Sequence, residues 1–255
     1  MSFQALWRIW ILITRSLHTL NLDANNEGYK PNFWKDGDSR IYDAAVNQLS
    51  AHPWHDPIEF DATLKQAFTM GDGYFIKGDG ERFDLNFRWF LRRLNRILYG
   101  NKSDDIGIPM FCVLERSIEG RWHFHTLTDR PPGISRIQLA YAVRLCWMQI
   151  PFAHERILFG PVDQNWKRYL LKPSQKPGNF ADAFRWTNNN LGYCEPITLP
   201  IVKRLHDAGD QWDPHGKLNG HWQLVLNEAR YLALNGQGLE VGTGTALESE
   251  RHWVL

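Results

Sequence analysis

Two histidines separated by one residue, His123 and His125, have the types and the spacing that could bind a metal ion. They begin the second of two apolar runs of alternating character within residues 111–129, and a short turn separates the runs, which indicates a β-hairpin. Residues i and i+2 of a strand point to the same face, so both imidazoles project together. Two imidazoles on one strand face can share a metal ion.

An acidic residue, Glu115, lies in the first run of the same hairpin. If the strands pair about the turn at Glu119-Gly120, its carboxylate reaches the face that carries His123 and His125 and supplies an oxygen ligand. The sequence therefore predicts a divalent-cation site made of one carboxylate and two imidazoles. The alternative is a solvated strand that carries two unrelated histidines.

A tyrosine and a lysine, Tyr169 and Lys172, are a second candidate pair for chemistry. We expect a helix over Asn165–Leu171, ending before Pro173, and residues i and i+3 share one helix face. A tyrosine hydroxyl with a pKa of about 10 is a poor nucleophile at neutral pH. It needs a neighbouring positive charge, or a metal ion that polarises a phosphate oxygen. The alternative is an amphipathic helix whose tyrosine packs and whose basic residues are solvated.

Four arginines lie on one predicted helix, over residues 83–98, in which apolar residues recur at helical spacing. They are Arg88, Arg92, Arg93 and Arg96. Acidic residues are absent from residues 86–102, and a run of one sign can follow a phosphate backbone. An ordinary solvated helix face is the alternative.

The composition restricts the class of protein. The 255 residues carry a net charge of +1, so any nucleic-acid-binding surface must be a local patch. The three cysteines are far apart in the sequence, which predicts neither a disulfide framework nor a cysteine metal site and favours a reducing cytoplasm. The apolar stretch between Arg8 and Arg15 is too short to span a bilayer, so we expect an amphipathic helix over residues 1–22 and no membrane partner.

The order of the expected elements predicts an α+β fold. A possible strand at residues 60–70 precedes a Gly/Asp-rich hairpin or loop, the arginine-bearing helix and the central hairpin. A helix at 137–148, capped by Ser135, a short strand at 157–159 and the helix with Tyr169 follow. This is the ferredoxin-like β-α-β-β-α-β order around a central antiparallel sheet. We expect this core at residues 60–175, between mainly helical extensions at 1–59 and 176–255.

With these motifs in this order, the sequence resembles the HUH endonuclease superfamily, and in particular its rolling-circle replication initiator (Rep) branch with a single catalytic tyrosine. His123-Phe124-His125 is similar to the His-hydrophobic-His metal motif, and Glu115 precedes it by eight residues, as the acidic third ligand does in Rep proteins. Tyr169-Leu170-Leu171-Lys172 is similar to the YxxK nucleophile motif and follows His125 by 44 residues.

The resemblance implies metal-dependent nicking and joining of single-stranded DNA. Glu115, His123 and His125 would bind Mg²⁺ or Mn²⁺, Tyr169 would form a 5′-phosphotyrosine bond, and Lys172 would orient the charged groups. The four arginines are candidates for contact with the DNA backbone. The implied role is initiation of rolling-circle replication of a plasmid or phage, with single-stranded or origin DNA, a host helicase and a polymerase as partners. A relaxase, a single-tyrosine transposase and a non-catalytic nucleic-acid-binding derivative are the alternatives.

Overall fold

The computed structural model describes residues 36–116, 120–162, 170, 191, 194–198 and 200–234. By its contacts the chain divides into two compact units, Met1–Phe33 and Trp34–Leu255, and all described residues belong to the second. The expected boundaries at residues 60 and 175 stay a prediction. The helix expected over residues 1–22 lies outside the described residues.

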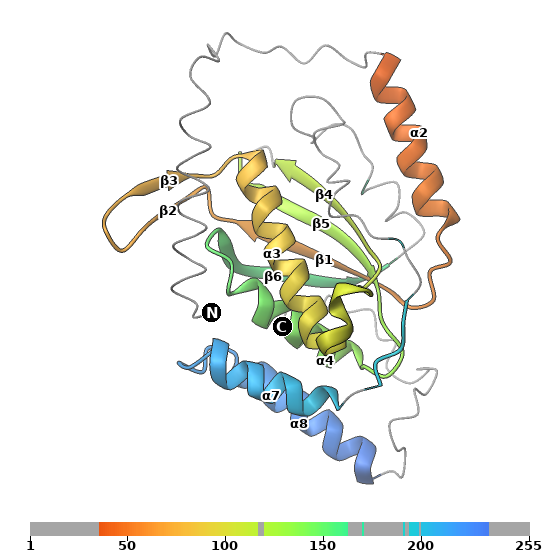
Figure 1. Ribbon diagram of the computed structural model, residues 1–255, viewed down its shortest axis with the longest axis vertical. Coiled ribbons are helices and arrows are strands. Elements are labelled where there is room, and N and C mark those ends of the chain that lie inside the picture. The colour runs from red at the N-terminus through yellow and green to blue at the C-terminus, as the bar shows by residue number, and fades with distance from the viewer. Residues whose placement is uncertain are drawn as a thin grey trace. The chain divides into compact units, whose positions relative to one another are not determined.

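A four-stranded antiparallel sheet forms the centre of the second unit (Figure 1). Its strands, in spatial order, are β4 (Met110–Arg116), β5 (Trp122–Asp129), β1 (Pro57–Leu64) and β6 (Ala153–Pro161). Every neighbouring pair is antiparallel. The fold is therefore α+β with a central antiparallel sheet, as the sequence predicts.

Two helices, α3 (Gly80–Tyr99) and α4 (Arg136–Trp147), cover one face of this sheet. Their aromatic side chains meet those of the sheet: the ring centroids of Phe60 and Phe90 lie 6.0 Å apart, and those of Phe87 and Phe124 lie 4.6 Å apart. Trp147 of α4 contacts this group through Phe124, at 6.4 Å. Strand β1 alternates buried and partly exposed residues, which directs its apolar side chains to these helices.

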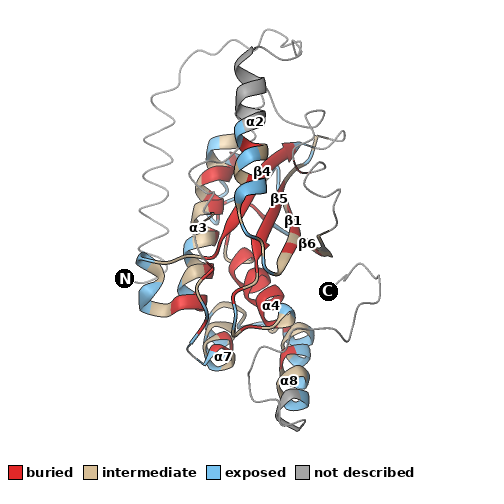
Figure 2. Ribbon diagram, turned by 90° about the vertical axis from the view of Figure 1, so that its right-hand side faces the viewer, coloured by how far each residue is buried: buried red, intermediate tan, exposed pale blue. Residues whose placement is uncertain are grey.

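Local sequence signals set the starts of both helices. The Asp79 carboxylate accepts a hydrogen bond from the Arg82 backbone N–H, which caps α3. Ser135 and Gln138 form a reciprocal capping box at the start of α4, so the predicted cap is confirmed. Helix α4 is buried along almost its whole length (Figure 2), because α7 (Ile201–Trp212) and α8 (Asn219–Leu234) pack on it.

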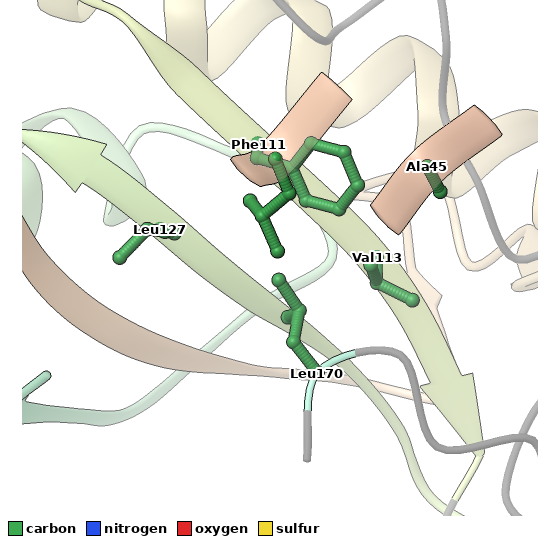
Figure 3. Close-up of a cluster of buried hydrophobic side chains, with 6 residues drawn as sticks. Ala45, Phe111, Val113, Leu127 and Leu170 are labelled. Atoms are coloured by element: carbon green, nitrogen blue, oxygen red, sulfur yellow. The ribbon is translucent and has the colours of Figure 1, made fainter. Parts of the chain in front are cut away.

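An apolar cluster covers part of the opposite face of the sheet (Figure 3). Its buried members come from α2 (Asp36–Ala51), strands β4 and β5, and one later residue: Ala45, Leu49, Phe111, Val113, Leu127 and Leu170. Phe111 and Val113 alternate with Met110, Cys112 and Leu114, which point to the helix-covered face. Both faces of β4 are consequently buried over residues 110–115.

The segment after β1 differs from the single strand expected at residues 60–70. Strand β1 ends at Leu64, and a separate hairpin of β2 (Ala67–Thr69) and β3 (Phe75–Lys77) follows, with Gly73 at a positive φ of 82° in its turn. A short 3₁₀ helix, η1 (Gly100–Asp104), follows α3. Strand β6 is longer than the predicted 157–159, and α7 was not predicted. None of the described helices is long and apolar enough to cross a bilayer.

Phe124 should be essential for stability although it lies between the two histidines. Its side chain is fully buried on the helix-covered face, so Phe124→Ala should lower the free energy of unfolding by about 3–5 kcal/mol. Phe75→Ala is the control, because Phe75 is 65% exposed and its removal should cost about 0.5 kcal/mol or less. Urea denaturation measures both, and equal losses would contradict the assigned orientation of β5.

Candidate metal centre

Strand register brings the three predicted ligands together. Glu115 of β4 pairs directly with His123 of β5, and Val113 pairs with His125. Because directly paired residues of antiparallel strands point to the same face, the carboxylate and both imidazoles lie on the face opposite α3 and α4. The last pair before the turn is Arg116 with Trp122, and Glu119 of the expected turn lies outside the described residues.

The potential ligand atoms are close enough to share one ion. The Glu115 Oε2 atom lies 3.0 Å from His125 Nε2 and 3.6 Å from His123 Nε2, and the two Nε2 atoms are 3.0 Å apart. One ligand atom from each residue lies within 4.8 Å of the others. The predicted convergence of these three side chains is therefore confirmed, and the group could hold a metal ion.

The three candidate ligands differ in their exposure to solvent. The Glu115 and His125 side chains are 1% and 3% exposed, whereas the His123 side chain is 18% exposed. Burial, followed by repulsion from His125, lowers the pKa of His123 to about 4. The His123 imidazole is therefore neutral at physiological pH, and the neutral form is the one that a metal ion binds.

A fourth residue, Asp61 of β1, contacts the group from the side of the next strand. Asp61 pairs directly with His125 across β1 and β5, and its Oδ1 atom accepts a hydrogen bond from His125 Nδ1. That bond leaves the Nε2 lone pair directed at Glu115 and His123. Carboxylates bound to the second nitrogen of a metal-binding histidine fix its ring orientation and tautomer.

Asp61 was not among the residues predicted from the sequence. The alternation of β1, with Phe60 and Ala62 in the core, contains half of the required signal, because it directs Asp61 to the other face. The missing half is the pairing of β1 with β5, which joins residues 64 positions apart.

The donor set fits a divalent transition ion. Imidazole nitrogens suit first-row transition ions, and the carboxylate oxygen also suits Mn²⁺ and Mg²⁺, although Mg²⁺ prefers oxygen ligands. Such an ion would polarise a phosphate oxygen as a Lewis acid. The fit rests on a buried carboxylate, a neutral imidazole and a second imidazole oriented by Asp61.

The remaining predicted residues are not brought to this group by the described structure. Tyr169 and Lys172 lie outside the described residues. The four arginines are on α3, which covers the opposite face of the sheet. Arg88 forms an ion pair of 2.6 Å with Asp84, and Arg93 lies over the ring of Trp89 at 5.2 Å, while Arg92 and Arg96 are exposed. Contact of α3 with DNA stays a prediction, separate from the metal ligands.

No family model, curated protein or solved structure matches the chain.

Asp61 should control metal affinity without being a ligand itself. Asp61→Asn should weaken Mn²⁺ binding by about 10- to 100-fold, because His125 loses the carboxylate that orients it. Glu115→Gln should abolish tight binding. Glu59→Gln is the matched control, since Glu59 is a carboxylate on the same face of β1, two residues away. Titration by electron paramagnetic resonance measures free Mn²⁺, and equal effects of Asp61→Asn and Glu59→Gln would reduce the role of Asp61 to net charge.

The stability of the metal-free protein should fall in acid because of His123. Its pKa is about 4 in the folded state and about 6.5 in the unfolded chain, so only the unfolded state binds this proton between those values. As the pH falls from about 6.5 to 4, this group should remove roughly 3 kcal/mol from the free energy of unfolding. In His123→Asn this contribution should be missing. Denaturation curves in EDTA across this range test it, and parallel pH profiles would contradict it.

Proposed function

We propose that this chain is a divalent-metal-dependent endonuclease that nicks and rejoins single-stranded DNA through a tyrosine nucleophile. The observation that carries the proposal is the convergence of Glu115, His123 and His125 on one sheet face, with Asp61 holding His125. The β-α-β-β-α-β order of β1, α3, β4, β5, α4 and β6 adds support, because it is the ferredoxin-like order of the HUH superfamily that the motifs resemble.

In this proposal each residue of the group has one task. Glu115, His123 and His125 hold a divalent ion, Mg²⁺ or Mn²⁺. When bound, this ion supplies Lewis-acid polarisation of the scissile phosphate. Asp61 keeps the His125 ring in the orientation that binding requires. The partly exposed edge of His123 is the side from which a phosphate approaches.

Tyr169 is the proposed nucleophile. Its phenolic oxygen forms a bond to the scissile phosphorus, the bond from phosphorus to the 3′ oxygen breaks, and the phenolic proton ends on the released 3′ hydroxyl. The products are a 5′-phosphotyrosine and a free 3′ end, which can prime synthesis or later attack the phosphotyrosine to rejoin the strand. Lys172 offers a positive charge to these oxygens.

The neighbour of Tyr169 in the chain supports this assignment. Leu170 is fully buried in the apolar cluster with Val113 and Leu127. Val113 is two residues before Glu115, and Leu127 is two residues after His125, so both lie on the face that carries the metal ligands. Leu170 itself therefore lies on the metal side of the sheet, one residue after the proposed nucleophile in the sequence.

The proposed role is initiation of rolling-circle replication of a plasmid or phage. A nick that leaves a 3′ hydroxyl supplies a primer, and a retained phosphotyrosine keeps the other end available for closure. Such a protein would work with a host helicase and a polymerase on single-stranded or origin DNA.

Incubation with single-stranded DNA and Mn²⁺ tests the chemistry. The wild-type chain should form a covalent adduct that survives denaturing electrophoresis and disappears in EDTA. Tyr169→Phe should retain Mn²⁺ binding yet lose both nicking and the adduct, because only the attacking oxygen is removed. Mass spectrometry should locate the nucleotide on the peptide that carries Tyr169.

Tyr74→Phe is the control for this experiment, because Tyr74 is an exposed tyrosine whose hydroxyl has no assigned task. It should nick DNA like the wild type. An adduct that persists in Tyr169→Phe, or that maps to another tyrosine, would overturn the assignment of the nucleophile. Absence of any adduct with the wild-type chain would overturn the proposed reaction.

A further inference from the structure

The hairpin β2–β3, called here the aromatic hairpin (residues 67–77), exposes two adjacent aromatic side chains. Tyr74 is 47% exposed and Phe75 is 65% exposed. They are two of the four exposed large hydrophobic residues in the part of the chain that the structure describes. Strand β3 has Phe75 and Lys77 exposed and Ile76 buried, so an aromatic ring and an ammonium group lie on one outward face.

The aromatic hairpin is held in a fixed form by bonds at its tip and its base. At the tip, the Met70 N–H donates to the Tyr74 carbonyl at 2.9 Å, and the Tyr74 N–H donates to the Asp72 carboxylate at 3.1 Å. At the base, the Gly78 N–H donates to the Gln66 carbonyl at 2.7 Å. Gly78 has no room for a Cβ atom, which would lie 2.2 Å from the Phe83 ring. The exposed rings are therefore presented on an ordered support.

A row of aromatic contacts runs from the base of the hairpin to Trp122, on the helix-covered face of the sheet. Phe68 of β2 contacts Phe152, Phe152 contacts Phe83, and Phe83 contacts Trp122, with ring centroids 4.8, 5.3 and 5.7 Å apart. Trp122 directly precedes His123. The hairpin also begins just after Thr63, which pairs with His123 at the end of β1. The aromatic hairpin thus starts at the end of the sheet where the metal ligands lie.

Exposed basic side chains surround the same end of the sheet. They are Lys65 and Lys77 beside the hairpin base, Arg116 and Arg121 at the β4–β5 turn, and Arg156 on β6. Arg156 is close enough to His123 to contribute to the lowering of its pKa. Two neighbouring acids have partners of their own: Asp72 accepts the Tyr74 N–H, and Asp79 forms an ion pair with Arg82. Glu155 adds one exposed acid on β6.

We propose that the aromatic hairpin is a stacking surface for the bases of single-stranded DNA at the end of the sheet that carries the metal ligands, with Tyr74 and Phe75 contacting bases and the surrounding Lys and Arg side chains contacting phosphates. Rings with a nearby positive charge are what unpaired bases on a phosphate backbone require. In a duplex the bases are stacked on one another, so this surface selects single strands. The inference rests on the proposed function for its choice of DNA, but it concerns binding and not cleavage.

Binding in EDTA, where no metal-dependent cleavage occurs, separates this inference from the reaction. Fluorescence anisotropy with labelled oligothymidylate should show that Phe75→Ala and Tyr74→Ala each weaken binding by about fivefold or more, since stacking on a base carries at least this much affinity. With an abasic oligonucleotide of the same length, which keeps the phosphates, the same substitutions should have little effect. Phe75→Trp and Tyr74→Phe keep an aromatic ring at each position and should bind oligothymidylate with nearly wild-type affinity.

Tyr231→Ala is the matched control, because Tyr231 is a 64% exposed aromatic on α8, a helix that packs on α4. It should bind both probes like the wild type. The inference is overturned if the hairpin variants bind oligothymidylate with wild-type affinity, or if their affinity for the abasic oligonucleotide falls by the same factor. It is also overturned if the substitutions change only the self-association of the protein, measured by light scattering. Hairpin-dependent binding by a chain that never forms an adduct would refute the proposed reaction and leave this inference standing. Normal binding by hairpin variants of an active nickase would refute this inference alone.

Discussion

The register of three neighbouring strands, β4, β5 and β1, is the constraint on which the candidate site depends. Glu115, His123 and His125, and Asp61 come from three different strands, and each reaches the same face only because Glu115 pairs with His123 and Asp61 pairs with His125. A slip of one residue in either pairing would turn a whole strand over and send its site residues into the helix layer. The apolar residues that alternate with them, such as Phe60 and Phe124, oppose that slip, because it would expose them to water.

The two faces of the sheet have different roles. One face is packed by α3 and α4 through interlocking aromatic rings, which hold the strands in place. The other is divided between an apolar cluster, which includes Val113, Leu127 and Leu170, and a buried polar group. A buried carboxylate is costly unless it has partners, and here two imidazoles lie beside it and could share an ion with it. The apolar cluster lies beside this polar group on the same face, and His123 is the most exposed of the three candidate ligands.

The aromatic side chains between Trp122 and the aromatic hairpin also pack the helix-covered side of the sheet. Phe152 and Phe83 are fully buried, and they join Trp122, beside His123, to Phe68 in the hairpin base. The same aromatic packing that stabilises this end of the sheet therefore fixes where Tyr74 and Phe75 are presented. A binding surface supported in this way needs little ordering when a ligand arrives, which favours affinity.

The local features are predictable from the sequence: the hairpin that carries Glu115, His123 and His125, the capped start of α4 at Ser135, and the amphipathic helix α3. Each depends on residues a few positions apart, whose periodicity and capping chemistry can be read directly. Three other features emerge only in the folded chain: Asp61 contacts His125, the arginines of α3 lie on the far side of the sheet, and Leu170 packs beside Val113. These facts depend on which strands pair and which face each helix covers. Such choices follow from the burial of apolar surface by the whole chain at once, and no short stretch of sequence encodes them.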